Sequence, residues 1–246
     1  MPSPLASRIA LVTGASRGIG YATALALAQA GAHVVAVART VGGLEELDDA
    51  IKQADGSATL VPLDIRDTDG IARLAKALDE RYGRLDILIG NAGALGPSSP
   101  LDHVPPQDWD EVFAVNVTAN WQLIRHMDPL FKRSDAGRVV FLTSNAASSL
   151  RAYRGPYSIT KAALEALART YAAETASTPI RVNLFAPGHT RTRMRAAVAP
   201  GEDPMILPTP ETVAAAIVPL CGADVQETGR LYDRRAGKFK SFRAPE

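Results

Sequence analysis

Residues 8–20 read RIALVTGASRGIG, a short apolar run that ends in a loop with three glycines. The apolar run has the length of a buried strand, and residues 21–30, which follow the loop, are mostly good helix formers. Glycines let a backbone pass close to a ligand, and the start of a helix offers free N–H groups to phosphate. The stretch therefore predicts a strand, a nucleotide-binding loop and a helix, with glycine as simple turn punctuation the alternative.

Apolar runs alternate with helical stretches along the rest of the chain. Further strands are expected at residues 33–38, 58–63, 86–89, 137–144, 180–185 and 229–233. Helices are expected at residues 41–54, 68–82 and 107–133, from 157 onward, and at 210–221. We expect an α/β fold, a doubly wound parallel sheet of about seven strands with helices on both faces, because the strands are apolar throughout. No linker-rich boundary divides the chain, so residues 1–246 are expected to form one domain.

The composition bears on several classes of protein. The chain has 246 residues, 46% of them apolar, and a net charge of +1, so a large core is expected and nucleic acid is not an expected partner. Cys221 is the only cysteine, which excludes an intramolecular disulfide and leaves no set of zinc ligands. No apolar run approaches the length of a membrane span, and residues 1–7 are too short and polar for a signal peptide. We expect a cytoplasmic protein without a metal site or a membrane partner.

A tyrosine and a lysine lie four residues apart in residues 154–161, which read RGPYSITK. The Gly-Pro pair indicates a helix start, so Tyr157 and Lys161 share one face of the helix, about 6 Å apart along its axis. A nearby ammonium favours the phenolate, so this tyrosine can exchange protons near neutral pH. Ser144 ends an apolar strand and can reach the same tyrosine from the edge of the sheet. Taken alone, the pair also fits a core tyrosine beside a solvated lysine.

The end of the second expected strand bears on the choice of nucleotide. A free ribose 2′-hydroxyl usually meets an acidic residue there, but the first acid after this strand is Glu45. Arg39 and Arg17 can instead flank a 2′-phosphate, because guanidinium groups match phosphate geometry. NADP(H) is therefore favoured over NAD(H), with two solvated surface arginines as the alternative.

Together these motifs resemble the single-domain short-chain dehydrogenase/reductases. The matching residues are Thr13-Gly14-Ala15-Ser16-Arg17-Gly18-Ile19-Gly20, Asn91-Ala92-Gly93, Asn116, Ser144, Tyr157, Lys161 and Pro187-Gly188. The resemblance covers residues 8–233, and a set in this order and at these spacings is highly specific. Residues 134–137, residues 187–194 and the basic tail further resemble the YciK-like oxidoreductases of bacteria. The resemblance implies a Rossmann-type fold and an NAD(P)-dependent enzyme that interconverts a carbonyl with a primary or secondary alcohol.

The resemblance also implies which residues handle the reaction. Tyr157 is the expected general acid in carbonyl reduction and general base in alcohol oxidation. Lys161 is expected to lower the pKa of this tyrosine and to hold the nicotinamide ribose hydroxyls. Ser144 is expected to hydrogen-bond the substrate oxygen, and Asn116 to hold a water that leads from Lys161 towards solvent. The hydride belongs to the cofactor, so the protein need only position it, move one proton and stabilise charge on oxygen.

The cofactor-binding residues follow from the same resemblance. Asp64 is expected to accept from the adenine amino group, with Ile65 on the ring, while residues 91–93 pass beneath the adenosine ribose. A helix cap at Asp64 and a simple turn at 91–93 are the alternatives. The full expected set is Gly14, Ser16, Arg17, Gly18, Ile19, Gly20, Arg39, Asp64, Ile65, Asn91, Ala92, Gly93, Tyr157, Lys161, Pro187, Gly188, Thr190 and Thr192.

Two features depart from the family pattern. Gly90 stands where many relatives have a second asparagine, and basic residues replace the usual Gly-Gly after the last strand. The tail, residues 234–246, carries Arg234, Arg235, Lys238, Lys240 and Arg243. Its Phe239 and Phe242 are expected to be buried against a partner. The resemblance implies a homodimer or homotetramer, formed through the helix of Tyr157 and the helix of Asn116.

Residues 188–208 are expected to form a short substrate lid. Arginines of the lid and of the segment before Tyr157 should converge on one mouth: Arg151, Arg154, Arg191, Arg193 and Arg195. The hypothesis is that some of them select an anionic or phosphate-bearing substrate, or reach the cofactor pyrophosphate. A solvated lid, or ion pairs with a neighbouring subunit, is the alternative.

Two rival functions fit parts of the same pattern. A catalytically silent NADP(H)-binding sensor or scaffold would typically lack the tyrosine or the lysine, and this chain has both. A nucleotide-sugar epimerase or dehydratase shares the tyrosine–lysine pair but needs a substantial C-terminal substrate domain, and too few residues follow Pro187 to form one. An oxidoreductase acting on a small-molecule carbonyl or alcohol is the favoured function.

Overall fold

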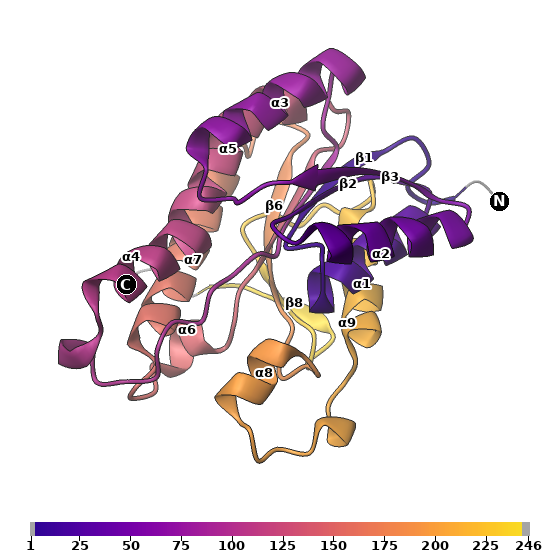
Figure 1. The fold of residues 1–246 in the computed structure, drawn as a ribbon. Coiled ribbons are helices and arrows are strands. Elements are labelled where there is room, and N and C mark those ends of the chain that lie inside the picture. Colours follow the sequence, from indigo (N-terminus) through magenta and orange to yellow (C-terminus); the bar gives the residue numbers. More distant parts are fainter. Residues whose placement is uncertain (1–2, 243–246) are drawn as a thin grey trace.

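One sheet of eight strands forms the centre of the computed structural model, which describes residues 3–242 (Figure 1). Its strands are β1 (Ile9–Thr13), β2 (His33–Ala38), β3 (Ser57–Pro62), β4 (Ile87–Gly90), β5 (Arg138–Leu142), β6 (Arg181–Ala186), β7 (Leu231–Asp233) and β8 (Lys238–Lys240). They lie in the order β3-β2-β1-β4-β5-β6-β7-β8, all parallel except β8, which pairs antiparallel with β7. The connections change direction between β1 and β4, and in such sheets ligands bind beyond the carboxyl ends of the strands at this point. The expected doubly wound fold is confirmed, with eight strands in place of about seven.

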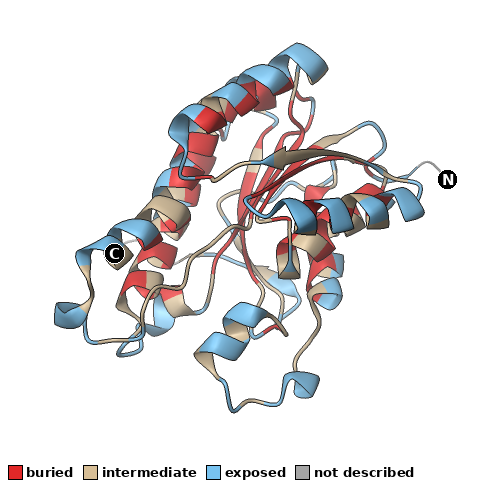
Figure 2. Ribbon diagram, viewed as in Figure 1, coloured by how far each residue is buried: buried red, intermediate tan, exposed pale blue. Residues whose placement is uncertain are grey.

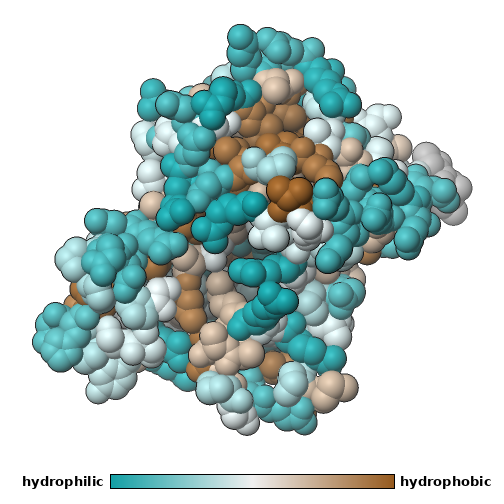
Figure 3. Space-filling view, viewed as in Figure 1, coloured by the Kyte–Doolittle hydropathy of each residue, from teal (hydrophilic) through white to brown (hydrophobic). Residues whose placement is uncertain are grey.

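Helices cover both faces of the sheet (Figure 1). The covering helices are α1 (Gly18–Gln29), α2 (Val41–Gln53), α3 (Thr68–Tyr82), α5 (Ala119–Phe131), α7 (Gly155–Glu174) and α9 (Pro210–Ile217). Residues of α1, α2 and α9 pack with Val12 and Val34 on one face, whereas α3, α5 and α7 pack with Leu11 and Val35 on the other. Successive strand residues point to opposite faces, so strands buried on both sides must be apolar throughout. The buried layer runs through the sheet and the inner helix faces (Figure 2), and the outer faces of the helices are mainly hydrophilic (Figure 3).

Shorter helical segments connect these elements, and some differ from the prediction. They are η1 (Leu101–His103), α4 (Pro106–Phe113), η2 (Ala114–Thr118), α6 (Ala146–Ser149), α8 (Arg193–Val198), η3 (Pro204–Ile206) and η4 (Val218–Cys221). The single helix predicted over residues 107–133 is wrong in detail, because a π-helical turn, η2, separates α4 from α5. The sequence does not predict α6 or α8, since four and six residues are too few to show a hydrophobic period.

The C-terminal tail forms β8 and packs against its own chain. The Phe239 ring contacts the edge of Tyr232 with centroids 5.2 Å apart, and Tyr232 stacks on Phe185 at 5.7 Å. Phe242 lies against α7, with the Arg169 guanidinium 4.5 Å from its ring centre. The premise that the tail offers these two phenylalanines no core is therefore wrong, since the edge of the sheet and α7 supply contacts, and their burial against a partner stays a prediction. Arg243 lies outside the described residues.

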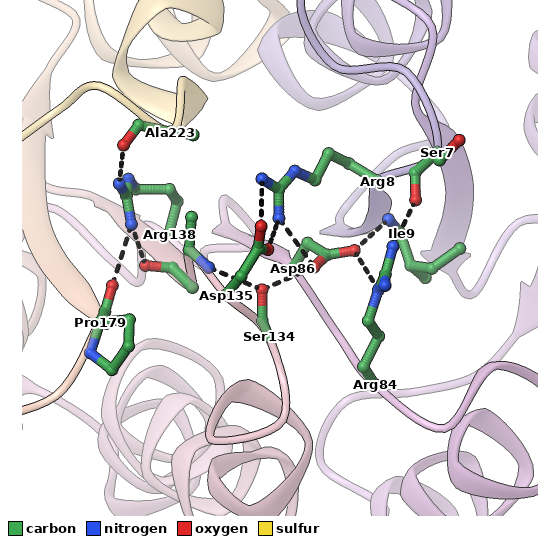
Figure 4. Close-up of polar contacts among 12 residues, drawn as sticks. Ser7, Arg8, Ile9, Arg84, Asp86, Ser134, Asp135, Arg138, Pro179 and Ala223 are labelled. Atoms are coloured by element: carbon green, nitrogen blue, oxygen red, sulfur yellow. Dashed lines mark hydrogen bonds and ion pairs between the residues drawn. The ribbon is translucent and has the colours of Figure 1, made fainter.

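Polar side chains at the amino ends of the strands form a saturated cluster (Figure 4). The fully buried carboxylate of Asp86 accepts hydrogen bonds from Arg8 Nη1 (3.2 Å), Arg84 Nε (3.2 Å), Ser134 Oγ (2.6 Å) and the Ile9 backbone N–H (2.8 Å). These contacts join the starts of β1 and β4 to the segment before β5. The cluster lies at the opposite end of the sheet from the glycine loop.

One apolar stretch, Pro204–Cys221, has the length and composition of a membrane-spanning helix, contrary to the expectation from the sequence. In the structure it is not one helix, because it comprises η3, α9 and η4 with prolines at each start. Val213 and Ile217 of α9 are buried in the core beside α1. Packing inside the protein therefore explains the apolar composition of α9.

Candidate active site

The residues expected at the site gather at the carboxyl ends of the parallel strands. Buried among them are Gly20, Ile65, Asn116, Lys161 and Thr190. Half-buried are Gly14, Ser16, Gly18, Ile19, Asp64, Asn91, Ala92, Gly93, Ser144, Tyr157, Pro187, Gly188 and Thr192. Arg17 and Arg39 are exposed. The loops after β1 to β6, together with η2 and the starts of α1 and α7, carry this set.

The loop between β1 and α1 has the features that a phosphate group requires. Gly14 has a φ of +66°, and a methyl group added at Gly20 would lie 2.2 Å from the Gly14 carbonyl oxygen. Among the described residues, α1 starts without a side-chain cap, and its first turn holds no acidic residue. In contrast, Asp67 caps α3 by accepting from the Gly70 N–H at 2.9 Å. The free N–H groups at the start of α1 fit a dinucleotide pyrophosphate.

Asn91 and Thr13 tie the end of β4 to the glycine loop. Asn91 Nδ2 donates to the Thr13 carbonyl oxygen at 2.8 Å and to that of Gly14 at 3.3 Å. The backbone N–H groups of Asn91 and Ala92 both donate to Thr13 Oγ1 at 3.1 Å. The Asn91 amide therefore shapes the cradle instead of reaching outward, and residues 91–93 are more than a simple turn. Sequence reasoning gave Thr13 no role, although a hydroxyl at the end of an apolar strand is a usable signal.

Basic side chains gather where an adenosine ribose would lie in this fold. Asp64 accepts from Arg66 Nη2 at 2.7 Å, and Arg39 Nη1 lies 3.8 Å from the same carboxylate. The hydrogen bond from Arg66, assisted by the positive charge of Arg39, holds the pKa of Asp64 below its ordinary value. The helix cap after β3 is Asp67, so the alternative reading of Asp64 as a cap is wrong. Arg17 is exposed at the start of α1, and its guanidinium joins Arg39 as a candidate ligand of a 2′-phosphate.

The end of β5 faces the tyrosine helix, α7. Lys161 Nζ donates to the Leu142 carbonyl oxygen at 2.8 Å and lies 5.7 Å from the centre of the Tyr157 ring. Ser144, two residues beyond that carbonyl, lies close enough to the Tyr157 side chain to lower the pKa of its hydroxyl. A methyl group added at Gly93 would lie 3.7 Å from Lys161 Nζ, so the loop after β4 passes beside the lysine. One edge of the candidate site thus presents a phenol, an ammonium and a hydroxyl.

Burial moves the pKa values of the tyrosine and the lysine in opposite directions. Desolvation raises the pKa of Tyr157, and the hydrogen bond with Ser144 opposes that rise. Desolvation lowers the pKa of Lys161 to about 8, and the charge of Glu165 opposes that fall. Burial therefore dominates the pKa of Tyr157 in this structure, and the lowering of that pKa by Lys161 stays a prediction. A phenol that keeps its proton at neutral pH is suited to donate it.

Asn116 lies in the π-helical turn, and its side chain is fully used. Its Oδ1 accepts from the Ala94 N–H at 2.8 Å, while its Nδ2 donates to the Ala94 carbonyl oxygen and to Thr160 Oγ1, both at 2.9 Å. A π turn offsets the helix by one residue, and such turns often occur at functional sites. The turn aims Asn116 at both the loop after β4 and the helix of Lys161. Asn120 Nδ2 donates to the Asn116 carbonyl oxygen at 2.9 Å.

The turn after β6 closes the other side of the site. Arg234 Nε donates to the Pro187 carbonyl oxygen at 2.5 Å, so the basic tail supports this turn. Thr190 is buried, and Thr192 caps α8 by accepting from the Arg195 N–H at 3.2 Å. The Thr192 methyl group also lies near Gly18, which brings the lid against the glycine loop. Sequence reasoning missed Arg234 because its partner is 47 residues away.

Three of the five convergent arginines are engaged within the protein. Arg154 Nη2 donates to the carbonyl oxygen of Val198 at 3.1 Å, which ties the α6–α7 loop to α8. Arg191 Nε donates to a lid carbonyl at 2.8 Å. Arg195 pairs with Glu202 through its Nε and Nη2 atoms at 2.5 and 2.6 Å. These three arginines brace the lid.

The sequence does not predict the contact between Thr143 and Glu165, and the structure explains the unusual glycine at position 90. Thr143 Oγ1 donates to Glu165 Oε1 at 2.7 Å, which links the residue before Ser144 to α7. A glutamate one helical turn after a candidate active-site lysine is a usable signal. Gly90 fits because the Phe141 ring and Asn120 Oδ1 fill its surroundings, at 2.3 and 2.8 Å from the place of a Cβ atom.

Comparisons with known proteins agree on the family. The family model described as short chain dehydrogenase matches residues 8–203. An uncharacterised oxidoreductase, YciK, from Escherichia coli is 36% identical over 238 residues, covering 95% of this chain and 94% of the relative. A 3-oxoacyl-[acyl-carrier-protein] reductase of rhamnolipid biosynthesis from Pseudomonas aeruginosa is 36% identical over 245 residues, covering 92% and 94%.

A solved structure extends the likeness to three dimensions. A short chain dehydrogenase from Escherichia coli, complexed with NADPH, superposes with a TM-score of 0.89 at 36% identity, covering 95% of this chain and 98% of that chain. The glycine loop, the tyrosine–lysine helix and the strand order are thus found in a chain that resembles these proteins over nearly its whole length. The chain belongs to the short chain dehydrogenase family of oxidoreductases.

Proposed function

We propose that this oxidoreductase uses NADP(H) to interconvert a small-molecule carbonyl and a primary or secondary alcohol, with Tyr157 as the general acid and base. The observation that carries the proposal is the juxtaposition at the end of β5. Tyr157, Ser144 and Lys161 meet there, and the uncapped start of α1 lies at the same edge of the sheet. When bound, the nicotinamide supplies or accepts the hydride.

The protein residues then handle the proton and the oxygen. In reduction, Tyr157 donates its proton to the carbonyl oxygen as that oxygen gains charge, and in oxidation it removes the alcohol proton. Ser144 donates a hydrogen bond to the same oxygen. Lys161 holds the ribose hydroxyls and supports the phenolate that forms. Asn116 holds a water through which the proton passes from Lys161 towards solvent.

The remaining predicted residues bind the cofactor. The glycine loop and the start of α1 hold the pyrophosphate, and residues 91–93 lie beneath the adenosine ribose. Asp64 and Ile65 contact the adenine, and the turn at Pro187 and Gly188, with Thr190 and Thr192, lines the nicotinamide side. Arg39 and Arg17 hold the 2′-phosphate, which favours NADP(H) over NAD(H), and the NADPH complex of the Escherichia coli relative supports this preference.

We also propose that residues 1–246 act as one nucleotide-binding domain in a cytoplasmic homodimer or homotetramer. The exposed Trp121 of α5 and the small residues Ala166 and Ala173 on the outer face of α7 support contact through these helices. Sedimentation of the purified protein checks the oligomeric state, and Trp121→Arg should yield monomers if this face is the contact.

A direct assay tests the proposed activity. NADPH and NADH oxidation is followed with a panel of aldehydes, ketones and acyl-carrier thioesters, with Tyr157→Phe as the control. The relative that is named a 3-oxoacyl-[acyl-carrier-protein] reductase justifies the thioesters. Turnover that depends on the Tyr157 hydroxyl supports the proposal, whereas equal turnover by Tyr157→Phe contradicts the mechanism.

A further inference from the structure

Exposed apolar side chains gather around the proposed active site. Among residues 3–242, eight large apolar side chains are exposed; Trp121 lies on α5, and Val41 lies two residues after Arg39 on the cofactor side of the site. The other six are 38–72% exposed: Leu101, Leu150, Tyr153, Met194, Met205 and Ile206. Scattered exposed apolar residues need no explanation, but a group at one place indicates a binding surface.

Three segments carry these side chains, and the segments meet beside Tyr157. Leu101 of η1 lies against Gly155, where an added methyl group would lie 2.2 Å from Leu101 Cδ2. Gly155 starts the helix that places Tyr157 two residues later. Arg154 joins the α6–α7 loop to α8 of the lid through its hydrogen bond to the Val198 carbonyl oxygen. Figure 1 shows α6 and α8 at the same end of the molecule.

The backbone before α7 is held in an unusual conformation. Leu150 has a φ of +44° and Tyr153 a φ of +65°, the left-handed region that bulky residues rarely adopt. Such strain persists where the surrounding structure enforces it and is concentrated at functional sites. Here it presents two large apolar side chains to solvent beside the proposed active site.

Most of the arginines beside the proposed active site already form hydrogen bonds or ion pairs within the protein. Arg154, Arg191 and Arg195 brace the lid, as described above. Arg151 and Arg193 are exposed, and within residues 3–242 their side chains take part in no hydrogen bond or ion pair. A charged substrate is therefore the competing outcome of the test.

We propose that the substrate carries an uncharged alkyl chain next to its carbonyl or alcohol group, covered by the apolar side chains of η1, the α6–α7 loop and the lid. Burying such a chain removes apolar surface of both partners from water, which stabilises the complex in proportion to chain length. The inference rests on the proposed function of this site.

The test measures kcat/KM with NADPH for straight-chain aldehydes from butanal to decanal. We expect a rise of about two- to fourfold for each added methylene, because full burial of one CH₂ contributes about 0.8 kcal/mol. A flat or falling series overturns the inference, as does a higher kcat/KM for an aldehyde of equal length that ends in a carboxylate.

A binding measurement separates failure of the inference from failure of the proposed function. Stabilisation of the NADP⁺-loaded protein by 1-decanol and by 1-butanol is compared by thermal unfolding. Stronger stabilisation by 1-decanol without turnover of any aldehyde supports the alkyl site and contradicts the proposed activity. Equal stabilisation by both alcohols overturns the inference, whether or not aldehydes are reduced.

Matched variants locate the surface. Met205→Ser combined with Ile206→Ser should lower kcat/KM for decanal about fivefold to tenfold and leave that for butanal unchanged. Val41→Ser removes an exposed apolar side chain at the start of α2, on the cofactor side of the site, and should leave the ratio of the decanal and butanal values unchanged. These residues are exposed, so loss of folding is not expected to confuse the result. Equal effects of the lid variant on both aldehydes contradict the assignment.

A second inference rests on different residues, those that join β5 to α7. Residues Tyr157, Lys161 and Glu165 follow one another at intervals of four on α7, and all three meet the end of β5. The contacts are Ser144 with Tyr157, the Leu142 carbonyl oxygen with Lys161, and Thr143 with Glu165. We infer that Glu165 is a positioning residue that holds Ser144 and Tyr157 in register.

Three variants test the role of Glu165. Glu165→Leu and Thr143→Val remove the hydrogen bond and should each lower kcat about tenfold without changing KM for NADPH. Glu165→Gln keeps an oxygen acceptor, so it should retain most of kcat at pH 7. Within residues 3–242, the negative charge of Glu165 raises the pKa of Lys161, and the positive charge of Arg169 lowers the pKa of Glu165. Glu165→Gln should therefore move the fall of kcat/KM at alkaline pH to lower pH. The inference is overturned if all three variants lose only thermal stability and keep the wild-type kcat.

Discussion

The two ends of the central strands use polar residues in opposite ways. At the amino ends, the buried carboxylate of Asp86 accepts four hydrogen bonds from three side chains and one backbone N–H. At the carboxyl ends, the start of α1 lacks a side-chain cap among the described residues, and the Lys161 ammonium is buried with a single carbonyl acceptor. Fully paired buried groups stabilise a fold, whereas incompletely paired groups remain available to a ligand. The comparison indicates that stability is concentrated at one end of the sheet and chemistry at the other.

Tyr157→Phe should have the largest effect at the carboxyl end. The substitution removes the group that moves the proton, so we expect kcat to fall about 10²- to 10⁴-fold, the usual contribution of general acid–base catalysis. The ring and its packing remain, so the melting temperature should change little. Steady-state kinetics and thermal unfolding of the same preparation check both statements.

Ser158→Ala is the matched control for the tyrosine variant. Ser158 is the next residue of α7, and its buried hydroxyl has no hydrogen-bond partner among residues 3–242. Removing it should leave kcat unchanged and leave stability equal or slightly higher, since an unsatisfied polar group is lost. A large loss of activity in Ser158→Ala would show that any substitution in this part of α7 disrupts the site. The effect of Tyr157→Phe could then not be assigned to the loss of its hydroxyl.

Asp86→Ala should have the complementary effect at the amino end. It leaves the Ser134 hydroxyl and the Ile9 N–H without their acceptor and removes one of the two carboxylates that pair with Arg8, so the free energy of unfolding should fall by about 3 kcal/mol or more. Denaturant unfolding measures this loss, and kcat per folded molecule should not change. Asp135→Ala, at the exposed edge of the same cluster, should cost only about 0–1 kcal/mol. A fall in kcat for Asp86→Ala in fully folded protein would break the separation between the two ends.

The local motifs of the carboxyl end can be predicted from the sequence, whereas its long-range contacts cannot. The glycine loop and the Tyr157–Lys161 spacing are local, so backbone geometry alone relates them to a strand end and a helix face. The link between Pro187 and Arg234 joins residues 47 positions apart, and no local pattern contains it. The raised pKa of Tyr157 depends on burial, which follows from packing and not from the distance to one lysine. β8 escapes prediction because it has three residues, of which only Phe239 is apolar, and its pairing with β7 is a tertiary contact.

Arg39→Ala should change cofactor preference rather than rate. If Arg39 binds the 2′-phosphate, loss of a charge-assisted contact of about 1.5–3 kcal/mol should raise KM for NADPH about 10- to 100-fold and leave KM for NADH nearly constant. Arg73→Ala is the matched control, since Arg73 is an exposed arginine that pairs with Asp67 at the start of α3. Equal changes in both KM values for Arg39→Ala would show that Arg39 does not read the phosphate.

The pH dependence of cofactor capture should show the smallest effect, about tenfold per pH unit. Burial lowers the pKa of Lys161 to about 8, so the ammonium that holds the ribose hydroxyls is lost above that pH. We expect kcat/KM for NADPH, which reports groups of the free enzyme, to fall above about pH 8. Lys161→Arg keeps the charge, so its profile should stay flat to a higher pH even if its rate is lower.

Stability distinguishes this loss of activity from alkaline unfolding. The folded pKa of Lys161 is below its ordinary value of 10.5, so between about pH 8 and 10.5 the unfolded chain binds more protons than the folded one. The contribution of this lysine to the free energy of unfolding therefore rises with pH in the window where activity falls. Denaturant unfolding of wild type and Lys161→Met at pH 7.5 and pH 9.5 isolates that contribution. If wild type loses stability relative to Lys161→Met as the pH rises, then Lys161 is not the buried group that controls the profile, and the carboxyl end is less dehydrated than its geometry indicates.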